Sequence, residues 1–167
     1  KTVGPGAKAE LDGGVKLCGK TSLKLVSTGR AMSHQDLTGK LKPDTTYRVS
    51  FFLRLKDVEP VGKGNAGVYA EFWDGDWRFF PRNSPPCGTR DWTYQEYVFT
   101  TGKKMPDHPY FHFLISGAKG TAWFDDVRVE EVVASDGDDT ARLQALLDSG
   151  KGRVEFPDGT FVVSKPL

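Results

Sequence analysis

The nine residues Tyr47-Arg48-Val49-Ser50-Phe51-Phe52-Leu53-Arg54-Leu55 decide the fold class of this chain. Apolar and polar side chains alternate along this stretch with a period of two, which is the period of a β-strand that buries one of its faces. The face expected to meet a core carries Tyr47, Val49, Phe51, Leu53 and Leu55, and the opposite face carries Arg48, Ser50, Phe52 and Arg54. The turn signal Lys42-Pro43-Asp44-Thr45 precedes this strand.

Short alternating segments of the same kind recur on both sides of this strand. They span residues 7–15, 21–26, 35–41, 66–73, 92–101, 110–116 and 121–132. The chain contains 19 glycines and 10 prolines that supply turns, and only residues 141–147 carry a helical stripe. Eight short strands joined by turns predict an all-β fold, and we expect a β-sandwich of the jelly-roll type.

The composition is that of a globular protein, with 38% hydrophobic and 27% charged residues. No apolar run approaches the roughly 20 residues that a membrane-spanning helix needs, so we expect no membrane partner. The 23 basic and 22 acidic residues give a net charge of +1, which gives no support to binding of nucleic acid. The two cysteines, Cys18 and Cys87, either pair in a disulfide or remain buried thiols.

The organisation of the chain changes near Val133. Residues 135–140 form a polar turn that can begin a helix, and leucines at helical spacing follow within residues 141–147. Glycines end this helix, and residues 153–163 are expected to form a short hairpin. We therefore predict a β-sandwich domain over residues 1–133 and a short helix plus hairpin over residues 134–167.

Four motifs in the first domain carry a resemblance when they are taken in order. They are the segment Gly19 to Leu25, the segment 35–54 with its core L-x-P-x-x-T-Y-x-V-S-F, the pair of segments Asp91-Trp92-Thr93 and Phe99-Thr100-Thr101, and the segment Trp123 to Val129. Together they resemble a carbohydrate-binding module of the galactose-binding-like type, which binds cellulose, xylan or mannan. The resemblance implies a secreted or cell-surface, monomeric, non-catalytic module that binds a polysaccharide.

The second segment resembles a different family. Its pattern is D-D-T-x-x-L-Q-x-x-L-D, a glycine turn, and then G-R-V-E-F-P-D-G-T-F-V-V. This pattern is similar to the N-terminal start of a pectate-lyase-like right-handed β-helix, in which a helix caps the first coil. The β-helix needs several stacked coils, and these are absent from residues 134–167. The resemblance implies a module covalently attached to a β-helix catalytic domain, a polysaccharide lyase or glycoside hydrolase, of which residues 134–167 are the truncated cap.

Aromatic and polar side chains on the outer face of one sheet are candidates for sugar binding. Pyranose rings stack their C–H groups on aromatic faces, and their hydroxyls need planar donors and acceptors. If the eight strands follow jelly-roll order, the second, fourth, fifth and seventh share one sheet. Its outer face would then collect Arg48, Phe52, Arg54, Tyr69, Glu71, Trp73 and His112. The alternative is a solvated strand face covered by the long loop that follows it.

The long loop over residues 74–91 is the second candidate, because loops above about 12 residues in compact domains are often functional. It carries Trp77, Arg78, Phe80, Arg82 and Arg90, and we expect Trp77 and Arg82 to bind sugar. The arginines allow an acidic sugar as ligand. The alternative is a loop that folds over the edge of the sandwich, with its aromatic side chains as a plug.

Asp125 alternates with apolar residues of the segment 121–132 and is expected to face inward, where a carboxylate needs a partner. A bound Ca²⁺ would supply one, since it takes oxygen ligands from carboxylates and backbone carbonyls. The resemblance implies such a structural calcium site, made by Asp125, by Glu10 or Asp12, and by carbonyls near Lys20. The alternative is that Asp125 caps the strand end or pairs with an arginine.

We expect no catalytic residues in this chain. The three histidines lack the spacing of a transition-metal site, and no nucleophile motif such as G-x-S-x-G occurs. A glycosidase needs two carboxylates across a cleft. Glu71 and Glu96 are expected on different sheets, and Asp74 and Asp76 lie in a loop without rigid support. The alternative function is a structural or protein-binding sandwich, which only a ligand test separates from sugar binding.

Overall fold

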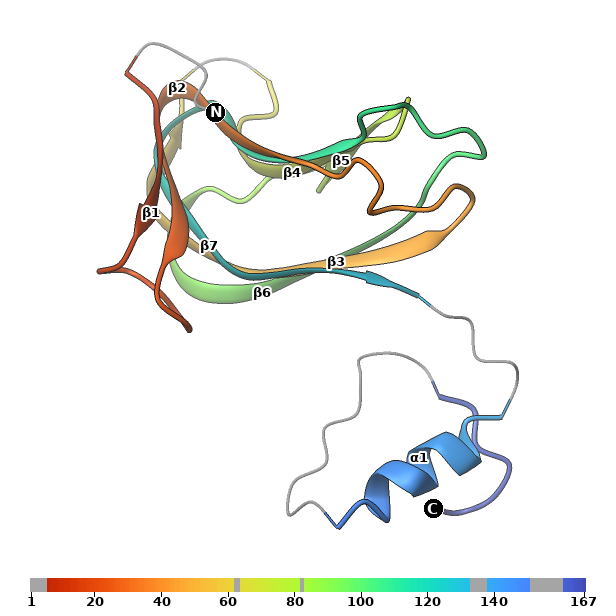
Figure 1. Ribbon diagram of the computed structural model, residues 1–167. Helices are drawn as coiled ribbons and strands as arrows, with labels where there is room; N and C mark the ends of the chain where they lie inside the picture. The colour runs from red at the N-terminus through yellow and green to blue at the C-terminus, as the bar shows by residue number, and fades with distance from the viewer. Residues whose placement is uncertain (1–5, 62–63, 82, 133–137, 151–160) are drawn as a thin grey trace. The chain divides into compact units, whose positions relative to one another are not determined.

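The computed structural model describes residues 6–61, 64–81, 83–132, 138–150 and 161–167 (Figure 1). The chain divides into two units, Lys1–Val132 and Val133–Leu167, and each is described by itself. In the part of the chain so described, no helix is long and apolar enough to cross a membrane.

Antiparallel β-strands build the first unit, which confirms the predicted all-β jelly-roll sandwich. Seven strands lie within the described residues: β1 (Lys8–Asp12), β2 (Ser22–Asp36), β3 (Thr46–Pro60), β4 (Gly67–Trp73), β5 (Trp77–Phe80), β6 (Gly88–Thr100) and β7 (Tyr110–Glu131). Their hydrogen-bonded order is β1-β2-β7-β3-β6, and β4 pairs with both β7 and β5. Strand β5 forms inside the segment that the sequence predicted as a long loop.

Two long strands, β2 and β7, bend and so belong to both layers of the sandwich. Residues 110–116 of β7 pair with β4, whereas residues 118–131 pair with β3. The bend in β7 falls at Gly117, which has a left-handed φ of +60°, and the register of β2 shifts between Gly29 and Arg30. The sequence predicted β7 as two strands, 110–116 and 121–132, because the alternation breaks at the bend. Of β2 it predicted the first part, within the segment 21–26, and the last two residues, within the segment 35–41.

The two layers are named by their central strands. The β4 layer contains β5, β4, residues 110–116 of β7 and residues 30–36 of β2. The β3 layer contains β1, residues 22–29 of β2, residues 118–131 of β7, β3 and β6. Figure 1 shows β4 and β5 in one layer and β3 and β6 in the other.

Aromatic side chains from both layers fill the core between them. The Phe51 ring of the β3 layer lies 5.0 Å from the Phe113 ring of the β4 layer, and the rings of Phe72 and Phe99 are 4.3 Å apart. The inward face predicted for the segment 47–55 is confirmed, because Tyr47, Val49, Phe51, Leu53 and Leu55 are all buried. The inward face predicted for Asp125 is wrong, since its neighbour Phe124 is the residue that joins the core.

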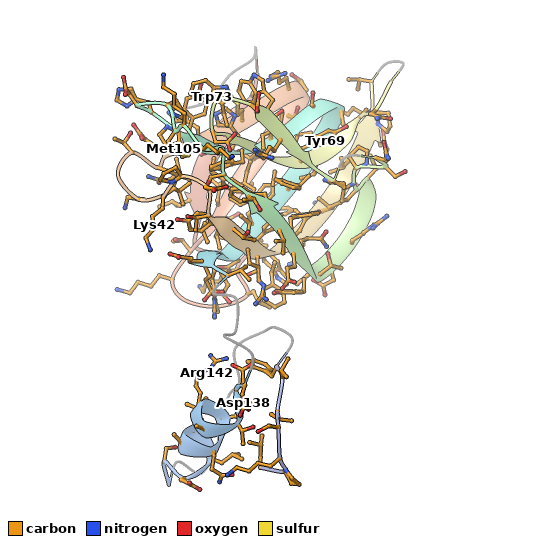
Figure 2. The ribbon with its side chains drawn as sticks, turned by 90° about the vertical axis from the view of Figure 1, so that its right-hand side faces the viewer. Lys42, Tyr69, Trp73, Met105, Asp138 and Arg142 are labelled. Atoms are coloured by element: carbon orange, nitrogen blue, oxygen red, sulfur yellow. The ribbon has the colours of Figure 1, made fainter. Side chains whose placement is uncertain are left out.

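The second unit contains the predicted helix as α1 (Thr140–Leu147). The carboxylate of Asp138 accepts hydrogen bonds from the hydroxyl and amide groups of Thr140 and Ser164. The backbone N–H of Asp139 donates to the Val162 carbonyl at 2.6 Å, and the Val162 N–H donates to the Asp139 carboxylate at 3.1 Å. Figure 2 labels Asp138 and Arg142 in this unit. Most of the predicted hairpin lies outside the described residues.

Candidate functional site

The outer face of the β4 layer gathers aromatic and polar side chains from four strands. On β4, Val68, Ala70 and Phe72 are buried in the core, so the alternation of the strand turns Tyr69, Glu71 and Trp73 outward. Figure 2 labels Tyr69 and Trp73 along this strand. The same face receives Trp77 from β5, Tyr110 and His112 from β7, and His34 from β2.

Ring contacts join these aromatic side chains into a continuous surface. The Tyr110 ring stacks on Trp73 at 4.9 Å and on His112 at 5.0 Å between ring centroids. Trp77 lies 6.2 Å from Tyr110 and 5.9 Å from His112. The residue Trp77 is 51% exposed, whereas His112 is only 7% exposed. Trp77 is therefore the ring of this cluster that presents the most surface to a ligand.

A buried pair of polar side chains lies within the same face. Glu71 and His112 are cross-strand partners, and His112 Nδ1 lies 3.2 Å from Glu71 Oε2. Only 6% of Glu71 is exposed, so its carboxylate needs this partner. The pairing fixes the orientation of the Glu71 carboxylate, which gives the face a preorganised hydrogen-bond acceptor.

A groove of about 430 Å³ opens on this face. It is lined by Asn65, Tyr69, Glu71, Asp76, Trp77, Arg78 and Ser116. Arg78 is held in place because its Nη2 donates to the buried carboxylate of Asp74 at 3.0 Å. The Tyr69 hydroxyl donates to the Asn65 carbonyl at 3.0 Å, which fixes that ring as well. The groove thus combines aromatic surface with oriented donors and acceptors, the combination that a sugar ring requires.

Five of the residues predicted to bind sugar lie together on this face: Tyr69, Glu71, Trp73, Trp77 and His112. The predicted position of Phe52 and Arg54 on the same sheet is wrong, and so is that of Arg48. Their strand, β3, pairs with β6 and with residues 118–131 of β7, so all three belong to the β3 layer. Arg82 lies outside the described residues.

Sequence reasoning missed Tyr110, Asn65, Asp76 and Ser116. Tyr110 could have been predicted from the sequence, because it alternates with His112 on the segment 110–116 and shares its outward face. Asn65 and Asp76 lie beside β4 and β5 in turns, and no local pattern predicts that two separate turns border one groove.

Among the residues predicted to bind calcium, Asp125 has its carboxylate already occupied by hydrogen-bond donors. Its carboxylate accepts hydrogen bonds from the backbone N–H groups of Leu17, Cys18 and Asp126, at 2.7, 3.2 and 2.8 Å. Burial raises the pKa of Asp125, but these N–H bonds outweigh the burial and hold the pKa below its ordinary value. The partner that a buried carboxylate needs is therefore supplied by the backbone of the loop that precedes β2.

Asp12 is engaged in a similar way. It accepts hydrogen bonds from Trp123 Nε1 at 2.9 Å and from the backbone N–H of Gly14 at 2.8 Å, and these bonds lower its pKa to about 2. The ammonium group of Lys24 lies 3.5 Å from Asp12 and 3.3 Å from Glu10. Calcium binds carboxylate oxygens, and here those oxygens are already engaged by N–H donors and by the Lys24 ammonium group. In this arrangement Asp125, Asp12 and Glu10 do not fit a calcium ion.

Lys20, the fourth residue of the predicted calcium site, has its carbonyl beside Gly13 in the loop between β1 and β2. Among the residues that the structure describes, no group of three or more His, Cys, Asp or Glu side chains is arranged to hold a metal ion. The two cysteines are both free. Cys18 lies beside Asp125, whereas the Cys87 thiol donates to the Ala66 carbonyl at 3.1 Å, so the disulfide alternative is wrong. The alternative of two buried thiols is wrong as well, because Cys18 is exposed and Cys87 is only half-buried.

Comparisons with known proteins give matches of structure. No family model matches the chain, and no curated protein matches it in sequence. The CBM22-1 xylan-binding domain of Paenibacillus barcinonensis Xyn10C is similar with a TM-score of 0.58 and 18% identity, covering 81% of this chain and 86% of that one. A family 16 carbohydrate-binding module is similar with a TM-score of 0.52 and 22% identity, covering 75% of this chain and 87% of that one.

A further similar structure is the enzymatically active domain of tailspike protein 4 from bacteriophage CBA120. Its TM-score is 0.54 at 13% identity, and the match covers 78% of this chain but only 19% of the tailspike chain. At identities of this order, structural similarity establishes the fold alone. The first unit has the jelly-roll β-sandwich fold that these structures share.

Proposed function

We propose that the first unit is a non-catalytic carbohydrate-binding module whose site is the groove on the outer face of the β4 layer. The observation that carries this proposal is the half-exposed Trp77 ring beside the buried Glu71–His112 pair. A flat aromatic ring next to a fixed carboxylate matches a pyranose, which has one apolar face and a rim of hydroxyls.

Each part of the groove has a role in this proposal. Trp77 stacks on the sugar ring, and Glu71 and Asp76 accept hydrogen bonds from hydroxyl groups of the sugar. Arg78 donates to sugar oxygens while its bond to Asp74 keeps it in place. Binding in such an open, hydrated groove is expected to be weak, with Kd values of roughly micromolar to millimolar.

The proposal excludes catalysis because the candidate carboxylate pairs are not poised for it. Glu96 belongs to β6 of the β3 layer, where it pairs with Arg48, so it cannot act across a cleft from Glu71. Asp74 is buried and accepts hydrogen bonds from Arg78 and from the backbone N–H of Gly102. Asp74 is therefore a buried carboxylate that anchors Arg78 and the Gly102 backbone, which is a structural role.

The similar structures support the proposal. One of them is a xylan-binding domain, and another is a carbohydrate-binding module of family 16. Both have the fold of the first unit over most of their length. In the first unit, the groove on the β4 layer is a chemically suitable site for a sugar.

We also propose that this monomeric module is secreted and attached through residues 134–167 to a β-helix catalytic domain, a polysaccharide lyase or glycoside hydrolase. The support is the resemblance of the second unit to the start of such a domain. The motif Asp138-Asp139-Thr140 also binds residues 162–164 through six hydrogen bonds, as a helix that caps a first coil must contact that coil. A module held on a polysaccharide would raise the substrate concentration near an attached enzyme.

The experiment is affinity electrophoresis of the full chain in gels that contain xylan, glucomannan or cellulose derivatives. We expect at least one neutral polysaccharide to retard the wild type, and Trp77→Ala to weaken that binding by about 1–2 kcal/mol, or roughly 5- to 30-fold. Tyr94→Ala is the matched control, because Tyr94 is a similarly exposed aromatic residue, 46% exposed, on the β3 layer.

Two outcomes would overturn the proposal. If none of these polysaccharides retards the wild type, the groove is not a site for neutral polysaccharides, and the first unit is a structural or protein-binding domain at this face. If Trp77→Ala and Tyr94→Ala are retarded as strongly as the wild type, the groove of the β4 layer is not the site.

A further inference from the structure

A second pocket, of about 550 Å³, opens on the β3 layer. Its lining comes from β3, β6, β7 and the loop after β1, and consists of Val15, Arg54, Leu55, Lys56, Asp57, Thr89, Arg90, Asp91 and Trp123. We call it the Trp123 pocket. It shares no residue with the groove of the β4 layer, so a ligand in it would be a second ligand.

Two β-bulges shape this pocket. Between the pairs Leu53–Thr93 and Leu55–Arg90, strand β6 contains one extra residue, and between Leu55–Arg90 and Val58–Gly88, strand β3 contains one. The bulge in β3 includes Asp57, which has a left-handed φ of +53°. Bulges re-aim side chains and are common beside functional sites. Here they turn successive residues of both strands, among them Arg54 and Arg90, towards one pocket.

The Trp123 ring lines the pocket in a fixed orientation, with 6% of the residue exposed. Lys24, Trp123 and Arg54 are cross-strand neighbours on β2, β7 and β3. The cationic groups of Lys24 and Arg54 lie 5.9 and 6.0 Å from the centre of the indole ring, within cation–π range. The indole N–H donates to Asp12 at 2.9 Å. This part of the lining is therefore rigid and flanked by positive charge before any ligand arrives.

The charge of this pocket is the reverse of that in the groove. Arg54, Lys56 and Arg90 outnumber the two acidic residues, Asp57 and Asp91. The Asp57 carboxylate already accepts a hydrogen bond from the Thr89 hydroxyl at 3.1 Å. In the groove, by contrast, Glu71 and Asp76 face a single cation, Arg78, which is bonded to a buried carboxylate.

The one ion pair inside the pocket is easily exchanged. Arg54 Nε lies 3.6 Å from Asp91 Oδ1, and the Asp91 side chain is 84% exposed. Exposed pairs at this separation contribute little stability. A ligand carboxylate that binds the guanidinium group through two parallel hydrogen bonds forms a stronger pair and displaces Asp91 to solvent.

We propose that the Trp123 pocket is a second carbohydrate site that takes an acidic sugar, a uronate. The carboxylate of the uronate binds Arg54 and Arg90, and its ring lies over the apolar surface of Val15 and Trp123. This proposal goes beyond the groove and is independent of it, because the two sites lie on different layers and favour ligands of different charge.

The test follows the indole N–H signals of the ¹⁵N-labelled full chain by NMR during titration with trigalacturonic acid or with neutral xylotetraose. We expect trigalacturonic acid to shift the Trp123 signal with a Kd that weakens as salt is added. We expect xylotetraose, where it binds, to shift the Trp77 signal instead. Indole signals are assigned by replacing each tryptophan with phenylalanine.

Variants at the pocket complete the test. Arg54→Gln and Arg90→Gln should each weaken trigalacturonate binding by about tenfold, the scale of one lost charged hydrogen bond. Arg128→Gln is the matched control, since Arg128 is an exposed arginine of the same layer that pairs with Asp126 outside the pocket. Trp77→Ala should leave trigalacturonate binding unchanged.

Three results would overturn the second site. The first is a wild type whose Trp123 signal does not respond to trigalacturonic acid. The second is an affinity of Arg54→Gln and Arg90→Gln equal to that of Arg128→Gln. The third is loss of trigalacturonate binding in Trp77→Ala, which would assign the acidic sugar to the groove. A different result would overturn the groove as a sugar site, namely a Trp77 indole signal that no neutral oligosaccharide shifts.

Discussion

Replacing Gly120 by alanine tests the close approach of the β7 backbone to the bulge of β3 beside the Trp123 pocket. Gly120 has a φ of +130°, a backbone conformation that side chains with a Cβ rarely adopt. An added Cβ would lie 2.4 Å from the Asp57 carbonyl oxygen and 2.7 Å from Val58 Cα. Both contacts are to backbone, so no side-chain rotation relieves them, and the bulge at Asp57 must move.

The structure gives the size of the effect. Holding alanine at this φ costs about 1–3 kcal/mol. The Asp57 oxygen must also retreat from 2.4 Å to at least 3.0 Å, which loosens the β3–β7 hydrogen bonds on either side of the bulge, at about 1 kcal/mol for each bond lost. We expect a loss of about 3 kcal/mol in the free energy of unfolding, or roughly 10 °C in Tm.

Urea unfolding followed by tryptophan fluorescence measures this loss. Gly29→Ala is the matched control, because Gly29 also lies on a long bent strand, does not have a left-handed φ, and has open space where a Cβ would stand. It should change the free energy of unfolding by no more than about 0.5 kcal/mol. Equal unfolding midpoints for Gly120→Ala and Gly29→Ala would refute the reasoning, since strain at Gly120 would then be absent.

Two further predictions concern the carboxylates beside β1 and β2. Because Asp125 and Asp12 bind N–H donors, excess chelator should leave the Tm of the wild type unchanged. If chelator lowers the Tm and added Ca²⁺ reverses the fall, the predicted calcium site is present after all. The pKa of Asp12 in the folded protein is about 2, below the ordinary value of 3.8, so its contacts stabilise the fold above pH 3.8. That contribution is lost as the pH falls towards 2. Asp12→Asn should therefore lower the Tm at neutral pH and make the Tm fall less below pH 3.8. The measurement is the Tm of the wild type and of Asp12→Asn as a function of pH. Parallel curves would contradict the stabilising role of Asp12.

Local alternation was sufficient to predict most of the strands. The segment 47–55 has the predicted buried face, and the outward positions of Tyr69, Glu71 and Trp73 follow from the buried Val68, Ala70 and Phe72. The helix over residues 141–147 is also present, as α1. Each of these features depends on side chains that are neighbours in sequence, and this is the information that a period of two or 3.6 residues contains.

Pairing between distant strands could not be predicted in the same way. The position of β3 in the layer opposite β4 depends on which half of β7 it pairs with, and no local pattern encodes that choice. This is why Phe52 and Arg54 were assigned to the wrong sheet. Unbroken alternation predicts that Asp125 faces the core. The left-handed bulge at Asp126 changes the phase of the alternation in β7, so Asp125 faces the other way.

The placement of β7 has a consequence for the order in which the protein acquires its structure during synthesis. Strands β2, β3 and β4 all precede β7 in the chain, and each of them takes β7 as a hydrogen-bonded neighbour. While the ribosome is still making residues 110–131, these three strands lack their common partner, and neither layer is complete. The sandwich is therefore expected to close in one late step after β7 emerges, so that the nascent chain exposes its aromatic core residues to chaperones until then.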